Sequence, residues 1–443
     1  MRCSSVGCSA LLSFSLDASG WFQGKLVPGD MVRSSYRACK PIILLLTVIL
    51  FSVSACSSNN QAQVQLSIFP DGKDFAFTII EDPDYGSYKQ KVIIYEYLDS
   101  LHLKTTKGIW VVDNKHGSST KGWKSNTRGV TASDKEYLQY NIDLQKRGFE
   151  ICLHTVGPGN DFREETRYGY DLFQSYFGHY PKINTNHADN IENIYWGAER
   201  FSNGLMKSLY GLVIQRFEGH VETSRYFWGD ICKEKTTYVR GFATDKLNTL
   251  SVNPSMPYHL EDKPYVNYWF GCTDGYNADK FKRVLSDDNI KKLVEERGVS
   301  LVYTHFAFGF FDENNHIDED VKRQLTKISK LNGWFVPAST ILDRLILVRN
   351  ISVNTKKNSI SIVNNNGERL TGVTILTNKE KLYCLNTSTW IYANNEGEML
   401  LGDLEPYAVI RLNGNEDMEK GNLESHYERW KITWEWLTGR FNK

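Results

Sequence analysis

Four side chains that could carry acid–base or metal chemistry lie at the ends of short apolar segments that we expect to be β-strands: Asp82, His154, His187 and His305. The segments are residues 75–80, 149–153, 182–185 and 299–304. Because the carboxyl ends of parallel strands in a barrel converge on one mouth, these side chains should meet there. One carboxylate and two imidazoles with an open position are the ligand set of a catalytic zinc-type site. The pattern predicts a divalent metal, zinc or similar, held by Asp82, His154 and His187, although each histidine alone would also suit a structural position.

The first of these segments ends in three carboxylates, Glu81, Asp82 and Asp84. Carboxylates this close together are costly unless a cation, a proton or water compensates their charge. A solvated acidic turn, in which Pro83 simply ends the strand, would meet that requirement. In the catalytic interpretation, Glu81 or Asp84 takes a proton from water and His305 protonates the leaving group.

Strands alternate with helices between residues 70 and 348, which predicts a parallel sheet. About seven strands fit this pattern, so we expect an α/β fold, a distorted (β/α) barrel. After residue 350, short strands separated by Asn- and Gly-rich turns predict a small, β-sandwich-like all-β module over residues 350–413. Residues 414–443 predict one C-terminal amphipathic helix, with Trp430 on its apolar face.

The N-terminal region has the pattern of an exported protein. A basic stretch precedes the apolar run 41–53, and Val-Ser-Ala-Cys ending at Cys56 resembles a bacterial lipobox. The run is too short for a comfortable membrane span. We therefore expect residues 1–55 to be a signal region and residues 56–69 to be a tether that attaches a cell-envelope lipoprotein to the membrane through lipid on Cys56. An uncleaved anchor is the alternative, and residues 1–30 could precede the true start at Met31.

The composition excludes some partners and leaves others open. The 443 residues carry 52 Lys and Arg against 52 Asp and Glu, so the net charge shows no nucleic-acid footprint. Aromatic residues make up 13% of the chain, which suits stacking on sugars and equally suits an ordinary core. The cysteines after Cys56 form no CxxC pair, so we expect buried small hydrophobic residues and no disulfide framework.

Two stretches of the chain resemble motifs of a known family. Residues 78–82, Thr-Ile-Ile-Glu-Asp, lie in the place of a T-F-D-D-G motif. Residues 301–305, Leu-Val-Tyr-Thr-His, match a late strand that runs into a histidine, and residues 333–343 look like the closing strand and helix. Over residues 70–348 the chain resembles the polysaccharide deacetylase, or NodB-homology, family.

The resemblance implies a distorted (β/α) barrel with a metal held by one Asp and two His, an Asp base and a late His acid. In this sequence the metal-binding Asp, the base and the acid correspond to Asp82, Glu81 and His305. The family's second motif, H-S/T-x-x-H, is reduced to His154-Thr155. Its Arg-Pro-Pro-Tyr element is replaced by Asn-His-Ala-Asp-Asn at residues 186–190, where His187 could supply the missing ligand.

Three functions remain open. The first is a metal-dependent hydrolase that removes acyl groups, N-acetyl in the first instance, from a cell-envelope or exported polysaccharide. The second is a glycan-binding or scaffolding lipoprotein whose barrel has lost its chemistry, as the reduced second motif suggests. The third is a glycoside hydrolase that would use two carboxylates such as Asp82 and Asp274. One arginine among Arg163, Arg167 and Arg240 could hold a carboxylate ionised. The residues expected to contact the glycan are Asn186, Asn190, Arg240, His259, Trp269 and Asp274.

Overall fold

The structure, a computed structural model, describes residues 61–200 and 216–415, apart from residues 114, 117, 121, 122, 126–128 and 189. The expected signal region, Cys56 and the C-terminal amphipathic helix lie outside the described residues, so those assignments stay predictions. No helix in the described ranges is long and apolar enough to cross a membrane.

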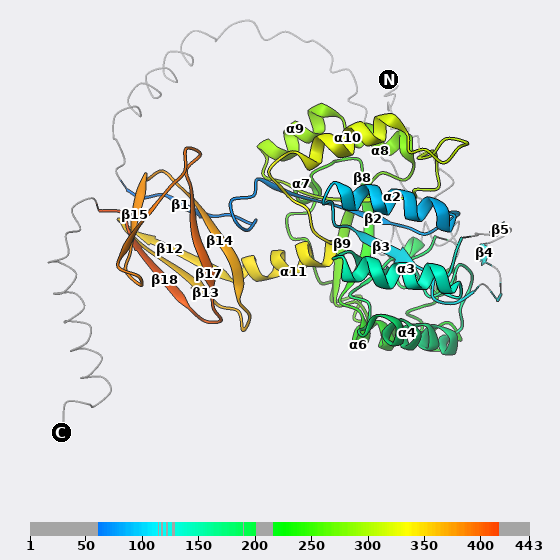
Figure 1. The fold of residues 1–443 in the computed structure, drawn as a ribbon. Coiled ribbons are helices and arrows are strands. Elements are labelled where there is room, and N and C mark those ends of the chain that lie inside the picture. Colours follow the sequence, from blue (N-terminus) through cyan, green and yellow to red (C-terminus); the bar gives the residue numbers. More distant parts are fainter. Residues whose placement is uncertain are drawn as a thin grey trace, which may run out of the picture. The chain divides into compact units, whose positions relative to one another are not determined.

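Seven parallel strands close into a barrel, which confirms the predicted fold class (Figure 1). They are β2 (Phe75–Glu81), β3 (Thr106–Ile109), β6 (Glu150–Leu153), β7 (Ile183–Asn184), β8 (Tyr238–Thr244), β9 (Tyr268–Asp274) and β10 (Val299–Thr304). Each strand pairs in parallel with the next, and β10 returns to β2, where Val299 aligns with Ala76 and Thr304 with Glu81. Because all seven strands run in the same direction, their carboxyl ends open at one mouth.

The barrel is distorted around β2. Strand β10 pairs along one edge of β2, whereas two strands share the other edge. Of these, β11 (Gly333–Trp334) pairs with the start of β2 at Phe75 and Ala76, and β3 pairs with its end at Ile80 and Glu81. All residues of β2 and β10 are buried, as is typical of parallel strands covered by helices.

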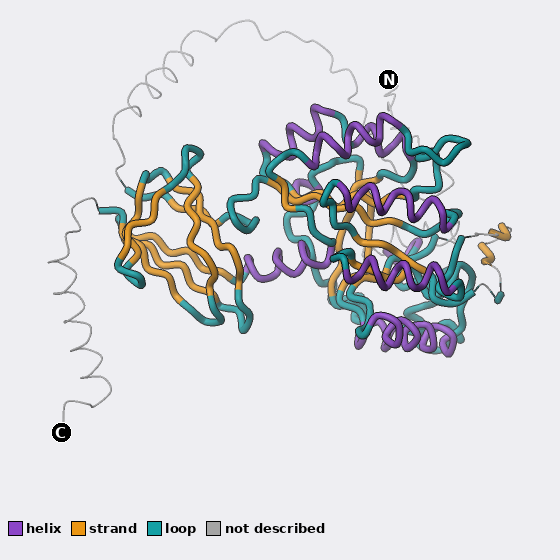
Figure 2. The backbone as a smooth tube through the Cα atoms, in the orientation of Figure 1, coloured by secondary structure: helices purple, strands orange, loops and turns teal. Residues whose placement is uncertain are grey.

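Helices connect the strands and lie outside the barrel (Figure 2). They are α2 (Tyr88–Ser100), α3 (Lys135–Lys146), α4 (Arg163–Phe177), α6 (Gly229–Lys235), α7 (Thr249–Val252), α8 (Ala278–Val284), α9 (Asp287–Glu295), α10 (Glu319–Ser329) and α11 (Ala338–Arg349), with a short 3-10 helix η1 (Gly197–Arg200). Asp134 caps α3 by accepting hydrogen bonds from the backbone N–H groups of Glu136 and Tyr137. Gly178 ends α4 with a φ of 79°. A small antiparallel hairpin, β4 (Ser118–Thr120) and β5 (Trp123–Ser125), lies between β3 and α3 in sequence.

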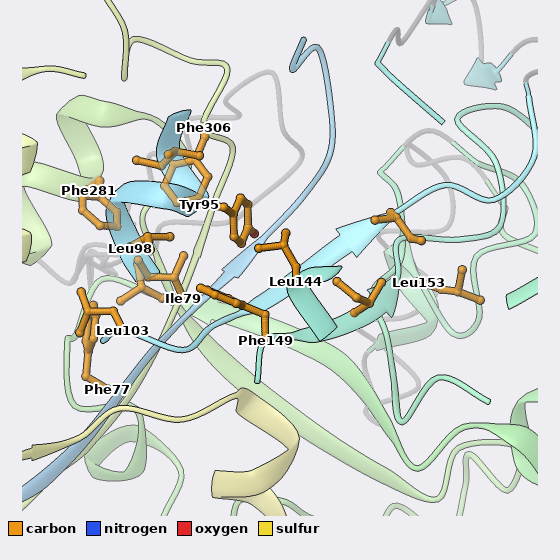
Figure 3. Packing of buried hydrophobic residues seen from close by; sticks show 14 of the residues in the cluster. Phe77, Ile79, Tyr95, Leu98, Leu103, Leu144, Phe149, Leu153, Phe281 and Phe306 are labelled. Carbon is orange, nitrogen blue, oxygen red and sulfur yellow. The ribbon is translucent and has the colours of Figure 1, made fainter. Parts of the chain in front are cut away.

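The main hydrophobic core lies between the strands and these helices (Figure 3). Phe75, Phe77 and Ile79 alternate along β2 and belong to one buried cluster with Leu98 of α2 and Leu144 of α3. Burial of apolar surface is the main stabilising contribution, at about 25 cal/mol per Å². Since a slip of one residue would turn this face away from the helices, the core also fixes which side chains of β2 point into the barrel.

The residues after α11 form the predicted all-β module from two antiparallel sheets. One sheet contains β12 (Ile351–Lys356), β13 (Ser359–Asn364), β18 (Val409–Asn413), β15 (Lys381–Cys384) and β16 (Thr389–Tyr392), and the other contains β1 (Val64–Leu66), β14 (Leu370–Thr377) and β17 (Glu398–Leu404). Ile362, Ile375 and Met399 come from both sheets and share one apolar cluster. The module is therefore sandwich-like.

Strand β1 lies in the segment for which the sequence predicted a polar tether. It pairs antiparallel with β14, where Val64 aligns with Thr377 and Leu66 with Ile375. Ala62, just before it, is buried in the module's core. Residues 62–66 thus belong to the β-module, because a partner strand far away in the sequence covers them.

Candidate active site

The mouth of the barrel brings together the four side chains identified in the sequence, and Asp84 with them. Asp82 and Asp84 follow β2, His154 follows β6, His187 follows β7 and His305 follows β10. All five side chains are buried. The cluster is therefore a product of the parallel topology, since its members are supplied by four different strands.

Asp84 is the carboxylate that faces the histidines. Its Oδ1 lies 3.0 Å from His187 Nε2, and its Oδ2 lies 3.3 Å from His154 Nε2 and 3.4 Å from His305 Nε2. One ligand atom from each of Asp84, His154 and His187 lies within 4.8 Å of the others. Burial alone would raise the pKa of Asp84, but the facing imidazoles hold it well below its ordinary value.

Asp82 has a different partner. Arg240 of β8 holds it in a two-pronged ion pair, with Nη1 2.8 Å from Oδ1 and Nη2 2.6 Å from Oδ2. Burial alone would raise the pKa of Asp82, and the Arg240 guanidinium and the neighbouring His154 outweigh that effect and lower it. Because a guanidinium is always charged, Asp82 stays ionised without a metal.

The imidazoles of His154 and His305 are oriented through their Nδ1 atoms. His154 Nδ1 lies 2.7 Å from the hydroxyl of Thr185, and His305 Nδ1 lies 3.2 Å from the carbonyl of Tyr276. Because a carbonyl oxygen can only accept a hydrogen bond, the Nδ1 atom of His305 must donate one and therefore carries a proton. Burial lowers the pKa of His154, although Asp82 and Asp84 oppose this, so a neutral imidazole with Nε2 toward Asp84 is favoured.

Asn190 fixes the tautomer of His187. Its Oδ1 lies 2.9 Å from His187 Nδ1, while its Nδ2 donates to the carbonyl of Gly159 at 2.6 Å and to Glu192 Oε1 at 2.7 Å. Because acceptors surround the amide nitrogen, the oxygen must face the imidazole, and His187 Nδ1 must donate. This leaves the Nε2 lone pair directed at Asp84, the arrangement that metal-binding histidines adopt.

Glu81, which the sequence offered as a base, points away from this cluster. Its buried carboxylate accepts hydrogen bonds from Lys91 Nζ and, at 2.9 Å, from the hydroxyl of Tyr95. Lys107 Nζ lies 3.9 Å from the same carboxylate. Successive side chains of a strand alternate between its two faces, so Glu81 and Asp82 cannot both point into the barrel.

The residues expected to contact a glycan have different surroundings. Arg240 pairs with Asp82 and Asn190 positions His187, as described above. Asn186 exchanges hydrogen bonds with the backbone of Ile194, at 3.2 and 3.1 Å, and so closes the loop that carries His187. Asp274 pairs with Lys280 at 2.8 Å at the end of β9. Trp269 is buried near the start of that strand, and exposed His259 bonds the carbonyl of Asn267 at 2.9 Å.

Two residues that position His154 were missed from the sequence. Trp110 donates its indole N–H to the carbonyl of His154 at 2.7 Å, and its ring centroid lies 5.7 Å from that of His187. Thr185 bonds His154 Nδ1. Both follow the ends of barrel strands, β3 and β7, so the strand-end rule that identified the histidines could have identified them too.

Comparisons with known proteins give only distant likenesses. No protein-family model and no curated sequence matches the chain. A Mycobacterium smegmatis protein assigned as a polysaccharide deacetylase is similar in structure, with 9% identity, a TM-score of 0.34 and coverage of 63% of this chain and 93% of that one. A Bacteroides fragilis protein assigned as an α-galactosidase has 13% identity, a TM-score of 0.25 and coverage of 79% and 80%. A glycoside hydrolase 29 member from a rumen bacterium has 10% identity, a TM-score of 0.30 and coverage of 76% and 72%. Likenesses this weak carry no argument about function.

Proposed function

We propose that this protein is a metal-dependent hydrolase that removes acyl groups, N-acetyl in the first instance, from a cell-envelope or exported polysaccharide. The observation that carries the proposal is the division of roles within one buried cluster. Asp84 faces His154 and His187, whereas Arg240 holds Asp82. A ligand set next to a separate, ionised base is what metal-assisted hydrolysis requires.

The residues present fit a divalent metal. The ligand atoms of Asp84, His154 and His187 converge, and both imidazoles are held through Nδ1 so that Nε2 faces the carboxylate. Asp84 Oδ2 is buried and accepts no well-aligned hydrogen bond from the described residues. One Asp and two His with an open position form a catalytic set. A divalent metal bound there, zinc or similar, would polarise the acyl carbonyl and activate a water molecule.

In this proposal Asp82 is the general base. It would accept a proton from the attacking water while the water oxygen bonds to the acyl carbon. Arg240 contacts both oxygens of Asp82 at 2.6–2.8 Å, which keeps the carboxylate ionised and fixes its plane. Each oxygen retains a lone pair that could receive the proton.

His305 is the proposed general acid. Its Nδ1 bonds the carbonyl of Tyr276, so its Nε2 faces the cluster, 3.4 Å from Asp84 and 3.9 Å from Asp82. A proton on Nε2 would move to the leaving nitrogen as the bond between that nitrogen and the acyl carbon breaks. The products would be a carboxylic acid and a free amine on the sugar.

We also propose that the protein is an exported lipoprotein of the bacterial cell envelope, anchored in the membrane through Cys56. The basic stretch, the apolar run 41–53 and the lipobox-like Val-Ser-Ala-Cys support this. Mass spectrometry of the mature protein should find lipid on Cys56 and no peptide from residues 31–55. Recovery of those residues in mature protein would contradict it.

The proposed activity is tested by metal analysis together with acetate release from a panel of acetylated envelope polysaccharides. We expect stoichiometric zinc or a similar metal, and acetate release that a chelator abolishes and added metal restores. If the zinc-loaded protein binds a glycan but releases nothing, it is a binding protein. Release of reducing sugar ends without acetate would instead favour a glycoside hydrolase.

A further inference from the structure

An aromatic shelf lies beside His305 at the mouth of the barrel. Phe308 has its ring centroid 5.1 Å from that of His305, and Tyr276 has its centroid 4.7 Å from the same imidazole. Tyr85, which follows Asp84 directly, lies 5.6 Å from Phe308 between ring centroids. Three aromatic rings from the loops after β2, β9 and β10 thus meet next to the proposed acid.

Tyr85 is unusual both in exposure and in backbone conformation. Its side chain is 50% exposed, although most large aromatic side chains of the barrel are buried or half-buried. Its φ is 56°, a left-handed conformation that a bulky residue adopts at a cost of about 1–3 kcal/mol. The turn from Asp84 therefore presents this ring at the surface instead of folding it into the core.

A hollow adjoins the shelf. It has a volume of about 290 Å³ and is lined by Asn277, Ala278, Asp279, Phe308 and Gly309. Its lining includes the aromatic residue Phe308 and the polar residues Asn277 and Asp279, and the side chain of Asp279 is 79% exposed. A hollow lined by both an aromatic residue and polar residues matches a sugar, whose C–H face packs on aromatic rings while its hydroxyls need hydrogen bonds.

Resting on the proposed function, we propose that Tyr85, Phe308 and this hollow form a subsite for a pyranose ring adjacent to the ring that carries the acyl group. Because Phe308 packs directly against His305, a sugar ring held there would lie next to the acylated ring, and we assign it to the same glycan. The protein would then act on residues within a glycan chain in preference to single sugars. Aromatic stacking of this kind is worth roughly a three- to tenfold change in affinity.

The test uses oligomers of increasing length cut from the polysaccharide that releases acetate in the panel above. With the parent protein, we expect KM to fall roughly three- to tenfold from the single acylated sugar to longer oligomers. Tyr85→Ala should remove most of this length dependence, and Tyr85→Phe, which keeps the ring, should retain it. Tyr168→Ala is the matched control, because Tyr168 is 56% exposed on α4.

Two results would separate this inference from the proposed function. If acetate is released but Tyr85→Ala keeps the same length dependence as Tyr168→Ala, the subsite is wrong and the hydrolase stands. If no acetylated glycan releases acetate with the zinc-loaded protein, the proposed function fails first, and the subsite falls with it.

Discussion

At the mouth of the barrel, Asp82 and Asp84 are separated only by Pro83, yet their carboxylates meet different partners. Arg240 contacts both oxygens of Asp82, whereas imidazoles surround Asp84. In both cases burial alone would raise the pKa; Arg240 and His154 lower the pKa of Asp82, and the three facing imidazoles lower that of Asp84. The guanidinium of Arg240 is always charged and pairs with the Asp82 carboxylate. Neutral imidazoles, in contrast, can bind a metal cation together with the Asp84 carboxylate. On this difference we base the proposal that Asp82 is the base and Asp84 the metal ligand.

Exchanging each carboxylate for its amide should separate the two roles. Asp84→Asn removes a charged ligand, so we expect zinc affinity to fall by more than about 100-fold, beyond the loss typical of an outer-shell change. Asp82→Asn should keep its zinc and lose about 100- to 10,000-fold in kcat, the range for general acid–base catalysis. Metal competition titration and acetate release measure the two effects.

Asp320→Asn provides the control for this pair, because the Asp320 side chain is 55% exposed on the surface of α10, where it pairs with Arg323. It should change neither zinc affinity nor kcat. Loss of zinc in Asp82→Asn with retention in Asp84→Asn would reverse our assignment. It would restore the ligand set that the sequence alone favoured.

The strand-end positions of the histidines can be read from the sequence, whereas the surroundings of the carboxylates cannot. His154, His187 and His305 follow strands, so a parallel barrel was enough to bring them together. The choice between Asp82 and Asp84 depends on how the chain turns beyond β2, which no periodicity encodes. The orientation of Glu81 could be predicted from the sequence. Alternation along β2 puts its side chain on the same face as Phe75, Phe77 and Ile79, which face the helices.

At the scale of elements, a buried charge cluster joins β2 to its neighbours. Glu81 contacts Lys91 and Tyr95 of α2, and Lys107 of β3 lies 3.9 Å away. Lys107 Nζ also donates to the hydroxyl of Tyr137 of α3 at 2.5 Å. Fully buried charges are stable only when they are paired and hydrogen-bonded. The cluster therefore holds the end of β2 in place immediately before the two proposed catalytic carboxylates.

Lys107 should make stability depend on pH in the alkaline range. Burial lowers its pKa from 10.5 to about 8, with Glu81 opposing. Between these values the unfolded chain binds more protons than the folded one, so the contribution of Lys107 to the free energy of unfolding rises with pH. Lys107→Met removes that contribution. We expect the difference in unfolding free energy between variant and parent to change by about 2 kcal/mol from pH 8 to pH 10, in favour of the parent at higher pH.

Urea denaturation at several pH values measures this difference, and other groups that titrate in the range cancel between the two proteins. Lys146→Met is the control, because the Lys146 side chain is 69% exposed. Its difference from the parent should stay constant with pH. A constant difference for Lys107→Met as well would mean that Lys107 stays protonated in the folded protein, through its ion pair with Glu81.

At the scale of the molecule, the chain enters the β-module before it forms the barrel. Strand β1 pairs with β14, whose residues follow it by about 310 positions, as in the pair Val64 and Thr377. Contacts of such sequence separation leave no trace in local periodicity, so the sequence predicts a tether where the structure has the three-residue strand β1. The module and the barrel are also joined by side chains, such as Arg297 before β10, which lies 2.9 Å from Glu398 of β17.

Arg344 of α11 is a buried side chain that ties the barrel to this module. It donates to the carbonyl of Ile68 at 2.5 Å and to that of Thr371 in β14 at 2.8 Å, and burial lowers its pKa to about 10.

Arg344→Ala would leave both carbonyls without this donor, at a cost of roughly 1–3 kcal/mol for each one that water does not reach. Because the proposed metal site lies wholly on the barrel, zinc affinity should not change. In calorimetry we expect a lower Tm for the module, and Arg323→Ala, on the exposed face of α10, should leave the trace unaltered. An unchanged Tm in Arg344→Ala would mean that the antiparallel pairing of β1 with β14 holds the module to the chain without help from α11.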